Sequence, residues 1–272
     1  MGFIMYTMAL TVLLTILWNV SNAAKYYIKF IVFGVVSLIS ACAPIPIMLL
    51  RPRDSRNALI PAAGLRACCK FMGLTYEVLG TENIVKDSGC VILINHQSML
   101  DLIVLACLWP VMPNCTVIAK KEVFYLQPFG LASWLWGTIF IDRMNVKGAR
   151  TAVNKTGDTI RTRKARVLMF PEGTRNSKKE LLPFKKGAFH LALASRCPIQ
   201  PVVVSRYTFL GKRRFDNGHM KIRILPTIST EGYTHDDMDK LIEEAYKVMS
   251  ENVDAISDSC QTNNNSASNL QK

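Results

Sequence analysis

The sequence predicts an α/β fold in which a mixed sheet is flanked by helices, preceded by an N-terminal membrane anchor of two helices. Three observations support this prediction. Short runs rich in β-branched residues alternate with longer helical stretches through the middle of the chain. Polar turns follow several of these runs, which places reactive side chains at strand ends. Half of the 272 residues are hydrophobic, enough for one α/β domain and a membrane segment.

Two uncharged stretches open the chain, Met1–Ala24 and Phe30–Leu50, with two lysines between them. Crossing a hydrocarbon core takes roughly 20 residues, so each stretch is about long enough. Residues 1–56 are therefore predicted to form an anchoring helical hairpin, with the arginines of 51–56 on the cytosolic side. The two helices either span the bilayer or lie within one leaflet. A cleaved signal peptide is disfavoured, because the first stretch lacks a basic start and a small-residue cleavage site.

The main domain is predicted to cover 57–255, and its most informative stretch begins with a buried strand at Cys90–Ile94. The polar residues that follow predict a turn containing His96, and Asp101 lies in the first turn of the helix expected next. On one continuous helix, residues five apart point roughly 140° away from each other. A strand, a turn and a new helix are therefore needed for His96 and Asp101 to meet.

His96 beside Asp101 predicts a general base with its orienting carboxylate. A histidine takes a proton from a hydroxyl near neutral pH, and the carboxylate fixes its tautomer and stabilises the imidazolium. No side-chain nucleophile is needed if the substrate supplies the hydroxyl. The alternative is a loop histidine without chemistry, next to a carboxylate that interacts with the positive end of the helix dipole.

Strands and helices alternate along the rest of the domain. We expect helices at 58–72, 100–109, 147–164, 188–195 and 236–253, and strands at 76–79, 116–119, 138–141, 167–170, 199–204 and 221–225. The strand at 167–170 is expected to be central and that at 221–225 to be an edge strand, preceded by a basic surface loop at 206–219. A polar, Asn-rich tail, 256–272, is predicted to be disordered.

The predicted strand at 167–170 leads into Pro171-Glu172-Gly173-Thr174-Arg175, a turn suited to phosphate. Gly173 permits close backbone approach, backbone amides and the Thr174 hydroxyl can donate hydrogen bonds, and Arg175 supplies positive charge. Glu172 repels phosphate, and it is expected instead to hold Arg175, or a neighbouring lysine, in place. The alternative is an ordinary polar turn.

The net charge of +13 predicts an anionic partner. Lys and Arg far outnumber acids in 166–223, whereas acids outnumber bases in 231–272. The basic segment lacks the interleaved aromatic residues of a single-strand binder and any nucleic-acid motif, so nucleic acid is disfavoured. Lipid phosphates and anionic head groups fit better. The eight cysteines show no metal-ligand spacing, which predicts reduced core thiols, no metal site and no cofactor.

Four motifs follow one another in order: Asn95-His-Gln-Ser-Met-Leu-Asp101, Gly137-Thr-Ile-Phe-Ile-Asp-Arg143, Phe170-Pro-Glu-Gly-Thr-Arg175 and Pro198-Ile-Gln-Pro-Val202. Together they resemble the four motifs of the glycerolipid acyltransferases, and the resemblance extends over 78–226. Within that family the chain is most similar to the branch that acylates lysophosphatidic acid.

The resemblance implies a set of site residues. His96 and Asp101 are implied to be catalytic. The implied substrate-binding residues are Lys120, with Lys121 as the alternative, and Arg143, Glu172, Gly173, Thr174 and Arg175. The apolar and aromatic stretch at 123–136 is either core or the wall of an acyl-chain groove.

The implied reaction moves a fatty acyl group from acyl-CoA, a co-substrate, to the sn-2 hydroxyl of lysophosphatidic acid and yields phosphatidic acid. The alternatives are another acceptor, such as glycerol 3-phosphate or another lysophospholipid, and a non-catalytic membrane protein that binds anionic lipid. A lipid bilayer is the expected partner. An anchored enzyme with a cytosolic domain is expected at the endoplasmic reticulum membrane. The pattern specifies neither an acyl-chain preference nor an oligomeric state.

Overall fold

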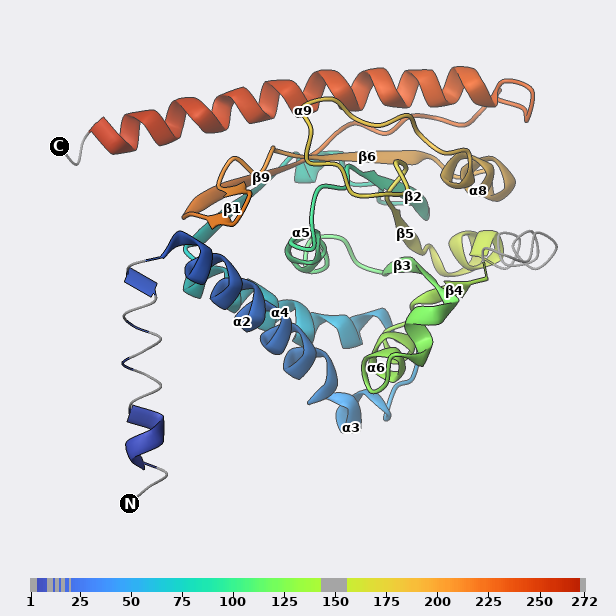
Figure 1. Cartoon of the computed structure of the whole chain (residues 1–272). Helices are drawn as coiled ribbons and strands as arrows, with labels where there is room; N and C mark the ends of the chain where they lie inside the picture. Colours follow the sequence, from blue (N-terminus) through green and yellow to red (C-terminus); the bar gives the residue numbers. More distant parts are fainter. Residues whose placement is uncertain are drawn as a thin grey trace.

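The computed structural model describes residues 4–8, 12, 15, 18–19, 21–142 and 156–269, with the backbone alone for 259–269. Its centre is a seven-stranded sheet in the order β1-β9-β6-β2-β5-β3-β4 (Figure 1). The five strands from β6 to β4 are mutually parallel, whereas β9 is antiparallel to β6 and carries β1 parallel to itself. The predicted mixed sheet is therefore confirmed. Its strands are β1 (Leu74–Leu79), β2 (Cys90–Ile94), β3 (Cys115–Lys120), β4 (Ile139–Ile141), β5 (Arg166–Met169), β6 (Ile199–Val204) and β9 (Gly218–Ile224).

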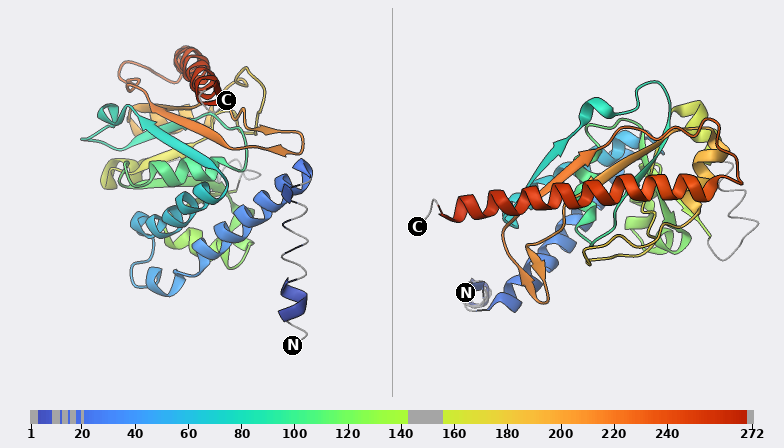
Figure 2. Two further views of the ribbon diagram at one scale, coloured as in Figure 1. Left: turned by 90° about the vertical axis from the view of Figure 1, so that its left-hand side faces the viewer. Right: turned by 90° about the horizontal axis from the view of Figure 1, so that it is seen from above.

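Helices cover both faces of the sheet (Figures 1 and 2). On one face lie α8 (Gly187–Ser195) and α9 (Met238–Asn269), and on the other lie α4 (Leu59–Phe71) and α5 (Asp101–Leu108). Helix α2 (Asn22–Cys42) packs outside them, against α4 and α6. The other described helical segments include α3 (Ile45–Met48), α6 (Phe129–Leu135), the short turns Ser55–Ala58, Thr81–Asn83 and Lys121–Tyr125, and residues 4–8 and 156–163.

Strand β2 shows how the sequence builds these layers. Cys90, Ile92 and Ile94 belong to the core beneath α4 and α5, and Val91 and Leu93 belong to the core beneath α8 and α9. Successive side chains of a strand point to opposite faces, so a strand covered on both sides has no polar position. The unbroken apolar run at 90–94 is the result. Burial also raises the pKa of the Cys90 thiol to about 12, as expected of a core cysteine.

The N-terminal segment differs from the predicted hairpin. Helix α2 begins at Asn22, well before Phe30, and Asn22–Met48 is long and apolar enough to cross a membrane. Phe33 is buried against the domain, whereas Ile31 and Ile39 are 64 % and 59 % exposed. Most of the first uncharged stretch lies outside the described residues. One apolar helix is therefore found, and the two-helix anchor is not confirmed.

Strand β9 lies between β1 and β6, so the prediction of an edge strand at 221–225 is wrong. Its parallel partner β1 is far away in sequence, and a local pattern carries no information about such pairing. The predicted surface loop at 206–219 contains the hairpin β7 (Leu210–Gly211) and β8 (Arg214–Phe215). Phe215 is buried because the Phe30 ring of α2 packs on it, with centroids 5.3 Å apart.

Helix α9 runs past its predicted end at residue 253 and into the predicted tail at 256–272. Ile256 is buried and continues the apolar stripe of Met249 and Val253, so the folded domain extends beyond 255. The division between an anchor at 1–56 and the main domain stays a prediction. Of the helix predicted at 147–164, residues 156–163 are helical and 147–155 lie outside the described residues.

Candidate active site

The parallel strands β6, β2, β5 and β3 end at one edge of the sheet, which we call the carboxyl edge. Residues 95–98 leave β2 between the ends of β6 and β5. Side chains that are far apart in sequence converge at such an edge, because parallel strands end together there. His96 after β2, Glu172 after β5 and Lys120 at the end of β3 all lie on this edge.

The side chains of His96 and Asp101 are in contact, as the predicted arrangement of strand, turn and helix requires. Nδ1 of His96 lies 2.6 Å from Oδ2 of Asp101, which begins α5 and is 3 % exposed. The imidazole stacks on the Phe170 ring with centroids 4.0 Å apart. Because an ionised carboxylate only accepts hydrogen bonds, Nδ1 carries the proton. Nε2 is then the ring nitrogen that can take a proton from a substrate.

Asp101 accepts hydrogen bonds from three further donors. The backbone amides of Gln97 and Ser98 donate to Oδ2 at 2.8 Å and 3.1 Å, and the Tyr207 hydroxyl donates to Oδ1 at 2.7 Å. Burial and the nearby Asp101 charge raise the pKa of Tyr207 well above its usual value, so this hydroxyl stays protonated. The carboxylate is consequently held at one orientation against the imidazole.

Glu172 makes contacts other than those predicted. It is 2 % exposed, and its Oε1 accepts from the backbone amide of His96 at 2.8 Å. Its Oε2 accepts from the amide of Leu182 at 2.9 Å. Within 156–258, the structure shows no ion pair between Glu172 and either Arg175 or a neighbouring lysine. A buried carboxylate needs such hydrogen bonds, and here they tie the His96 turn to the segment after β5.

Two buried amide side chains hold the same turn from the β6 side. Asn95 Oδ1 accepts from the Val204 amide at 2.8 Å, and Asn95 Nδ2 donates to the Val204 carbonyl at 3.1 Å. Gln97 Nε2 donates to the Ser205 carbonyl at 3.0 Å. The His96 turn is thus clamped between the ends of β5 and β6, the kind of support that keeps a reactive side chain in place.

The predicted phosphate turn is exposed at the carboxyl edge. Gly173 has a left-handed φ of +69°, which favours glycine, and a Cβ there would lie 2.9 Å from the Lys185 ammonium nitrogen. Thr174 and Arg175 are exposed beside it. The turn therefore presents a guanidinium, a hydroxyl and, from Lys185, an ammonium group to a phosphate.

Lys120 is exposed at the end of β3. Lys121 pairs with Asp142, their charged atoms 4.0 Å apart, which leaves Lys120 as the better candidate of the two. Arg143, the residue after Asp142, lies outside the described residues. Its predicted role is not tested by the structure.

An apolar cavity of about 260 Å³ begins beside the site. It is lined by residues of α2, α4, α5, β3 and α6, among them Leu102 next to Asp101 and Ala119 next to Lys120. Val123, Phe129 and Trp136 of the predicted aromatic stretch also line it. Some residues of the stretch at 123–136 therefore belong to the core, and others line the cavity.

Sequence reasoning missed Tyr207, Asn95, Gln97 and Lys185 as parts of the site. Tyr207 lies in a segment that looked like a basic surface loop, but it is buried in the core, with its ring centroid 5.4 Å from that of Phe209. Asn95 and Gln97 flank His96 in the first motif, which was a usable signal. Lys185 follows the phosphate turn by ten residues, and only the fold places it across Gly173.

Comparison with known proteins agrees with this architecture. Residues 75–205 match the family model described as Acyltransferase. The crystal structure of the 1-acyl-sn-glycerophosphate (LPA) acyltransferase, PlsC, from Thermotoga maritima has a TM-score of 0.63 and 21 % sequence identity, covering 86 % of this chain and 98 % of that one. The two proteins therefore share a fold.

Curated relatives match over most of the chain. The 1-acyl-sn-glycerol-3-phosphate acyltransferase alpha of Homo sapiens is 39 % identical over 234 residues, covering 85 % of this chain and 82 % of the relative. The human beta enzyme is 34 % identical over 246 residues, covering 89 % and 88 %. The 1-acyl-sn-glycerol-3-phosphate acyltransferase of Saccharomyces cerevisiae is 42 % identical over 191 residues, covering 68 % and 61 %.

Proposed function

Because this chain belongs to the acyltransferase family, among the 1-acyl-sn-glycerol-3-phosphate acyltransferases, we propose that it acylates the sn-2 hydroxyl of lysophosphatidic acid and makes phosphatidic acid. Acyl-CoA is the acyl donor in this proposal. The names of the relatives support lysophosphatidic acid as the acyl acceptor. The observation that carries the chemistry is the contact of 2.6 Å between His96 and Asp101, with Nε2 left as the proton acceptor.

The reaction needs one base and one stabilised cation. Nε2 of His96 takes the proton of the sn-2 hydroxyl while that oxygen attacks the thioester carbonyl. Asp101 stabilises the resulting imidazolium through Nδ1. When the tetrahedral intermediate collapses, the carbon–sulfur bond breaks, and the coenzyme A thiolate leaves and takes the proton from His96. The histidine returns to its starting state, and the new ester stays on the acceptor.

The acceptor's phosphate is assigned to the turn at Gly173, Thr174 and Arg175. A guanidinium donates two parallel hydrogen bonds to a phosphate, and the left-handed Gly173 permits close backbone approach. Lys120 lies at the same edge, and the motif assigns Arg143 to the same role. Holding the phosphate directs the hydroxyl at His96, which is catalysis by positioning.

The acyl chain is assigned to the apolar cavity between α5 and α6. Membrane association is assigned to α2, whose exposed apolar side chains lie opposite buried Phe33. Lipid substrates then enter from the bilayer. We place the protein at the cytosolic side of the endoplasmic reticulum membrane, as the sequence predicts.

An acceptor panel tests the substrate assignment. Membranes containing the wild-type protein are incubated with labelled oleoyl-coenzyme A and, in turn, lysophosphatidic acid, glycerol 3-phosphate and lysophosphatidylcholine. Labelled phosphatidic acid formed fastest from lysophosphatidic acid supports the proposal. Faster product formation from either other acceptor contradicts the acceptor but keeps the chemistry.

Replacing Arg175 by alanine tests the phosphate assignment. The exposed guanidinium is expected to lower KM for lysophosphatidic acid, so R175A should raise that KM about tenfold. Lys178→Ala, an equal charge loss three residues away, serves as the control and should leave KM unchanged. Equal kinetics for R175A and wild type would remove Arg175 from the acceptor site.

A further inference from the structure

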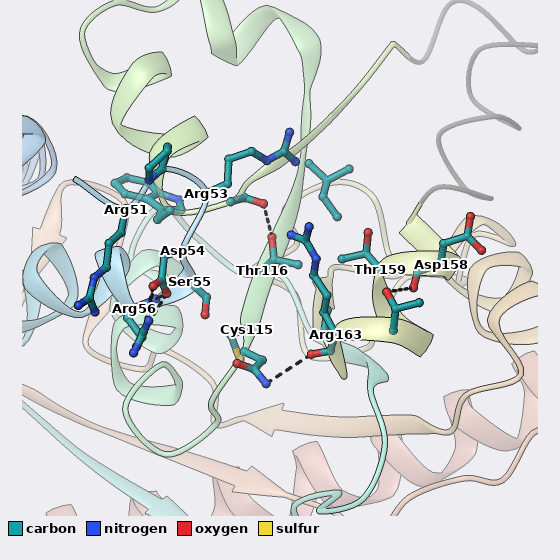
Figure 3. A pocket seen from close by; sticks show the side chains of 17 residues that line it. Arg51, Arg53, Asp54, Ser55, Arg56, Cys115, Thr116, Asp158, Thr159 and Arg163 are labelled. Carbon is teal, nitrogen blue, oxygen red and sulfur yellow. Dashed lines mark hydrogen bonds and ion pairs between the residues drawn. The ribbon is translucent and has the colours of Figure 1, made fainter. Parts of the chain in front are cut away.

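A large open cavity lies at the opposite edge of the sheet, where β3, β4 and β5 begin. Its volume is about 970 Å³. Its walls are the turn at 51–56, the strand starts at 114–116 and 137–139, and the helical residues before β5 at 158–163 (Figure 3). Strand β3 has six residues and so separates this amino edge from the carboxyl edge by roughly 20 Å. The cavity is therefore distinct from the site at His96.

Arginine side chains dominate the lining. Figure 3 shows Arg53 and Arg163 extending into the same part of the cavity from two different walls, with Arg51 at its rim. Arg56 is neutralised by Asp54, to which it donates from Nε and Nη2. We refer to this site, defined by Arg51, Arg53 and Arg163, as the arginine cavity.

The carboxylates nearby form their ion pairs with other arginines, although the Asp54 charge also acts on Arg51. Asp54 pairs with Arg56, and Asp158 pairs with Arg161. Among residues 21–142 and 156–258, the structure shows no ion pair to Arg51, Arg53 or Arg163. Like charges that share a cavity repel one another, and an anion placed between them relieves that repulsion.

Arg53 is held in an unusual conformation. Its φ is +62°, a left-handed value that costs a residue with a Cβ free energy. The guanidinium lies over the Trp134 ring, 5.8 Å from its centroid, a cation–π contact that directs the side chain. Gly137, with a φ of +92°, lies next to the Arg53 backbone, since a Cβ on Gly137 would be 3.4 Å from the Arg53 carbonyl oxygen. The strained residue is thus one of the two arginines that extend into the cavity.

Exposed apolar residues adjoin the arginine cavity. Ile47, Leu49 and Leu50 are 63 %, 56 % and 80 % exposed and directly precede Arg51 in the chain. Exposed apolar side chains next to basic ones are the arrangement that meets an anionic membrane surface, with the apolar groups in the acyl region and the arginines at the head groups.

We propose that the arginine cavity binds the phosphate group of a second ligand, and that an anionic phospholipid head group in the membrane is its source. Arg53 and Arg163 donate hydrogen bonds to the phosphate oxygens, and Arg51 contributes charge at the rim. This site adds to the acceptor site and does not depend on the proposed reaction. A soluble phosphate compound has the same chemistry and is separated by experiment.

Vesicle binding tests the proposal on the full chain. The assays use the His96→Ala variant as parent, so that no turnover changes the lipid. Binding is measured by flotation with phosphatidylcholine vesicles that contain or lack phosphatidic acid, and the gain due to phosphatidic acid is compared between variants. In a second arm, glycerol 3-phosphate and inorganic phosphate are titrated while the fluorescence of the tryptophans is followed, because Trp136 lines the cavity.

The variants are Arg53→Gly, Arg163→Gln and their combination. Each should lower the phosphatidic-acid-dependent gain about fivefold, and the combination more. Lys247→Gln, an equal charge loss on exposed α9, is the matched control and should bind as the parent does. R53G relieves the left-handed strain, so it should melt at or above the parent's temperature, and lost binding then does not come from unfolding.

The vesicle assay and the titration with soluble phosphate together show where the bound phosphate group comes from. An arginine-dependent gain on vesicles supports the site with a lipid head group. An arginine-dependent fluorescence change with soluble phosphate alone supports the phosphate site with a soluble source. If the double variant behaves like Lys247→Gln in both arms, the arginine cavity is not an anion site.

Discussion

At the carboxyl edge of the sheet, two carboxylates are buried and each is satisfied by neighbouring donors, whereas at the amino edge three arginines that form no ion pair within 21–142 and 156–258 stand around an open cavity. Asp101 and Glu172 are 3 % and 2 % exposed and accept hydrogen bonds from the His96 ring, backbone amides and Tyr207. Arg53 and Arg163 are exposed. The difference indicates two tasks: positioning a reactive group in the first case, and receiving a charge from outside in the second.

Asp101→Asn should have the largest effect among the supporting residues of the carboxyl edge. An asparagine oxygen can still accept from the amides of Gln97 and Ser98, and its nitrogen can donate to the Tyr207 oxygen, so the fold should be kept. The negative charge that stabilises the imidazolium is lost, and kcat should fall about a hundredfold. Steady-state assays and a thermal melt measure the two effects. Unchanged kcat would show that Asp101 is only structural.

Glu172→Gln should have the next largest effect. The amide group of glutamine places a donor against the backbone N–H of either His96 or Leu182, which leaves one buried donor without an acceptor. We expect a loss of about 1–3 kcal/mol in the free energy of unfolding and about a tenfold to thirtyfold lower kcat from a displaced His96. Glu180→Gln, an exposed acid on the same segment, is the control. If E172Q and E180Q behave alike, the clamp from β5 does not position His96.

The sequence predicted the central pair because His96 and Asp101 are close along the chain and their secondary structure is local. The apolar runs at 90–94 and 199–204 likewise identified buried strands, since covering both faces leaves no polar position. The sheet order and the interior place of β9 were out of reach, because they depend on pairing between distant strands. The Glu172 contact with the His96 amide joins two segments that are far apart in sequence, so motif reasoning assigned that carboxylate to Arg175 or a neighbouring lysine instead.

Tyr207→Phe should have a smaller effect. It removes one donor to Asp101 Oδ1 and should lower the free energy of unfolding by about 1–2 kcal/mol, with kcat reduced tenfold or less. The pKa of Tyr207 is raised in the folded protein, whereas an unfolded tyrosine ionises at about pH 10. The unfolded state therefore loses a proton first, and this residue makes the wild type less stable as pH rises above that value.

Denaturant melts between neutral and alkaline pH check the Tyr207 prediction. Y207F should lose less stability on the alkaline side than the wild type does. Tyr233→Phe, which removes a hydroxyl that donates to Glu244 away from the site, is the control for kcat. A Y207F variant with the same alkaline slope as the wild type would contradict a buried, protonated Tyr207.

Arg163→Gln should have the smallest effect on turnover. Its guanidinium lies at the amino edge, so kcat and KM for lysophosphatidic acid presented in detergent should stay within about twofold of wild type. The assay is the same as for the carboxyl-edge variants. A large drop in kcat would contradict the assignment of separate tasks to the two edges, because it would show that the arginine cavity contributes to the reaction.

The most direct test of the account compares His96→Ala with His190→Ala. His190 is an exposed histidine on α8, so its loss matches the chemical change without touching the Asp101 contact. Both variants are assayed for phosphatidic acid formed from labelled oleoyl-coenzyme A and lysophosphatidic acid. We predict that H96A retains at most about one thousandth of the wild-type kcat and that H190A is fully active. Phosphatidic acid formation by H96A at a rate near wild type would contradict the assignment of His96 as the general base.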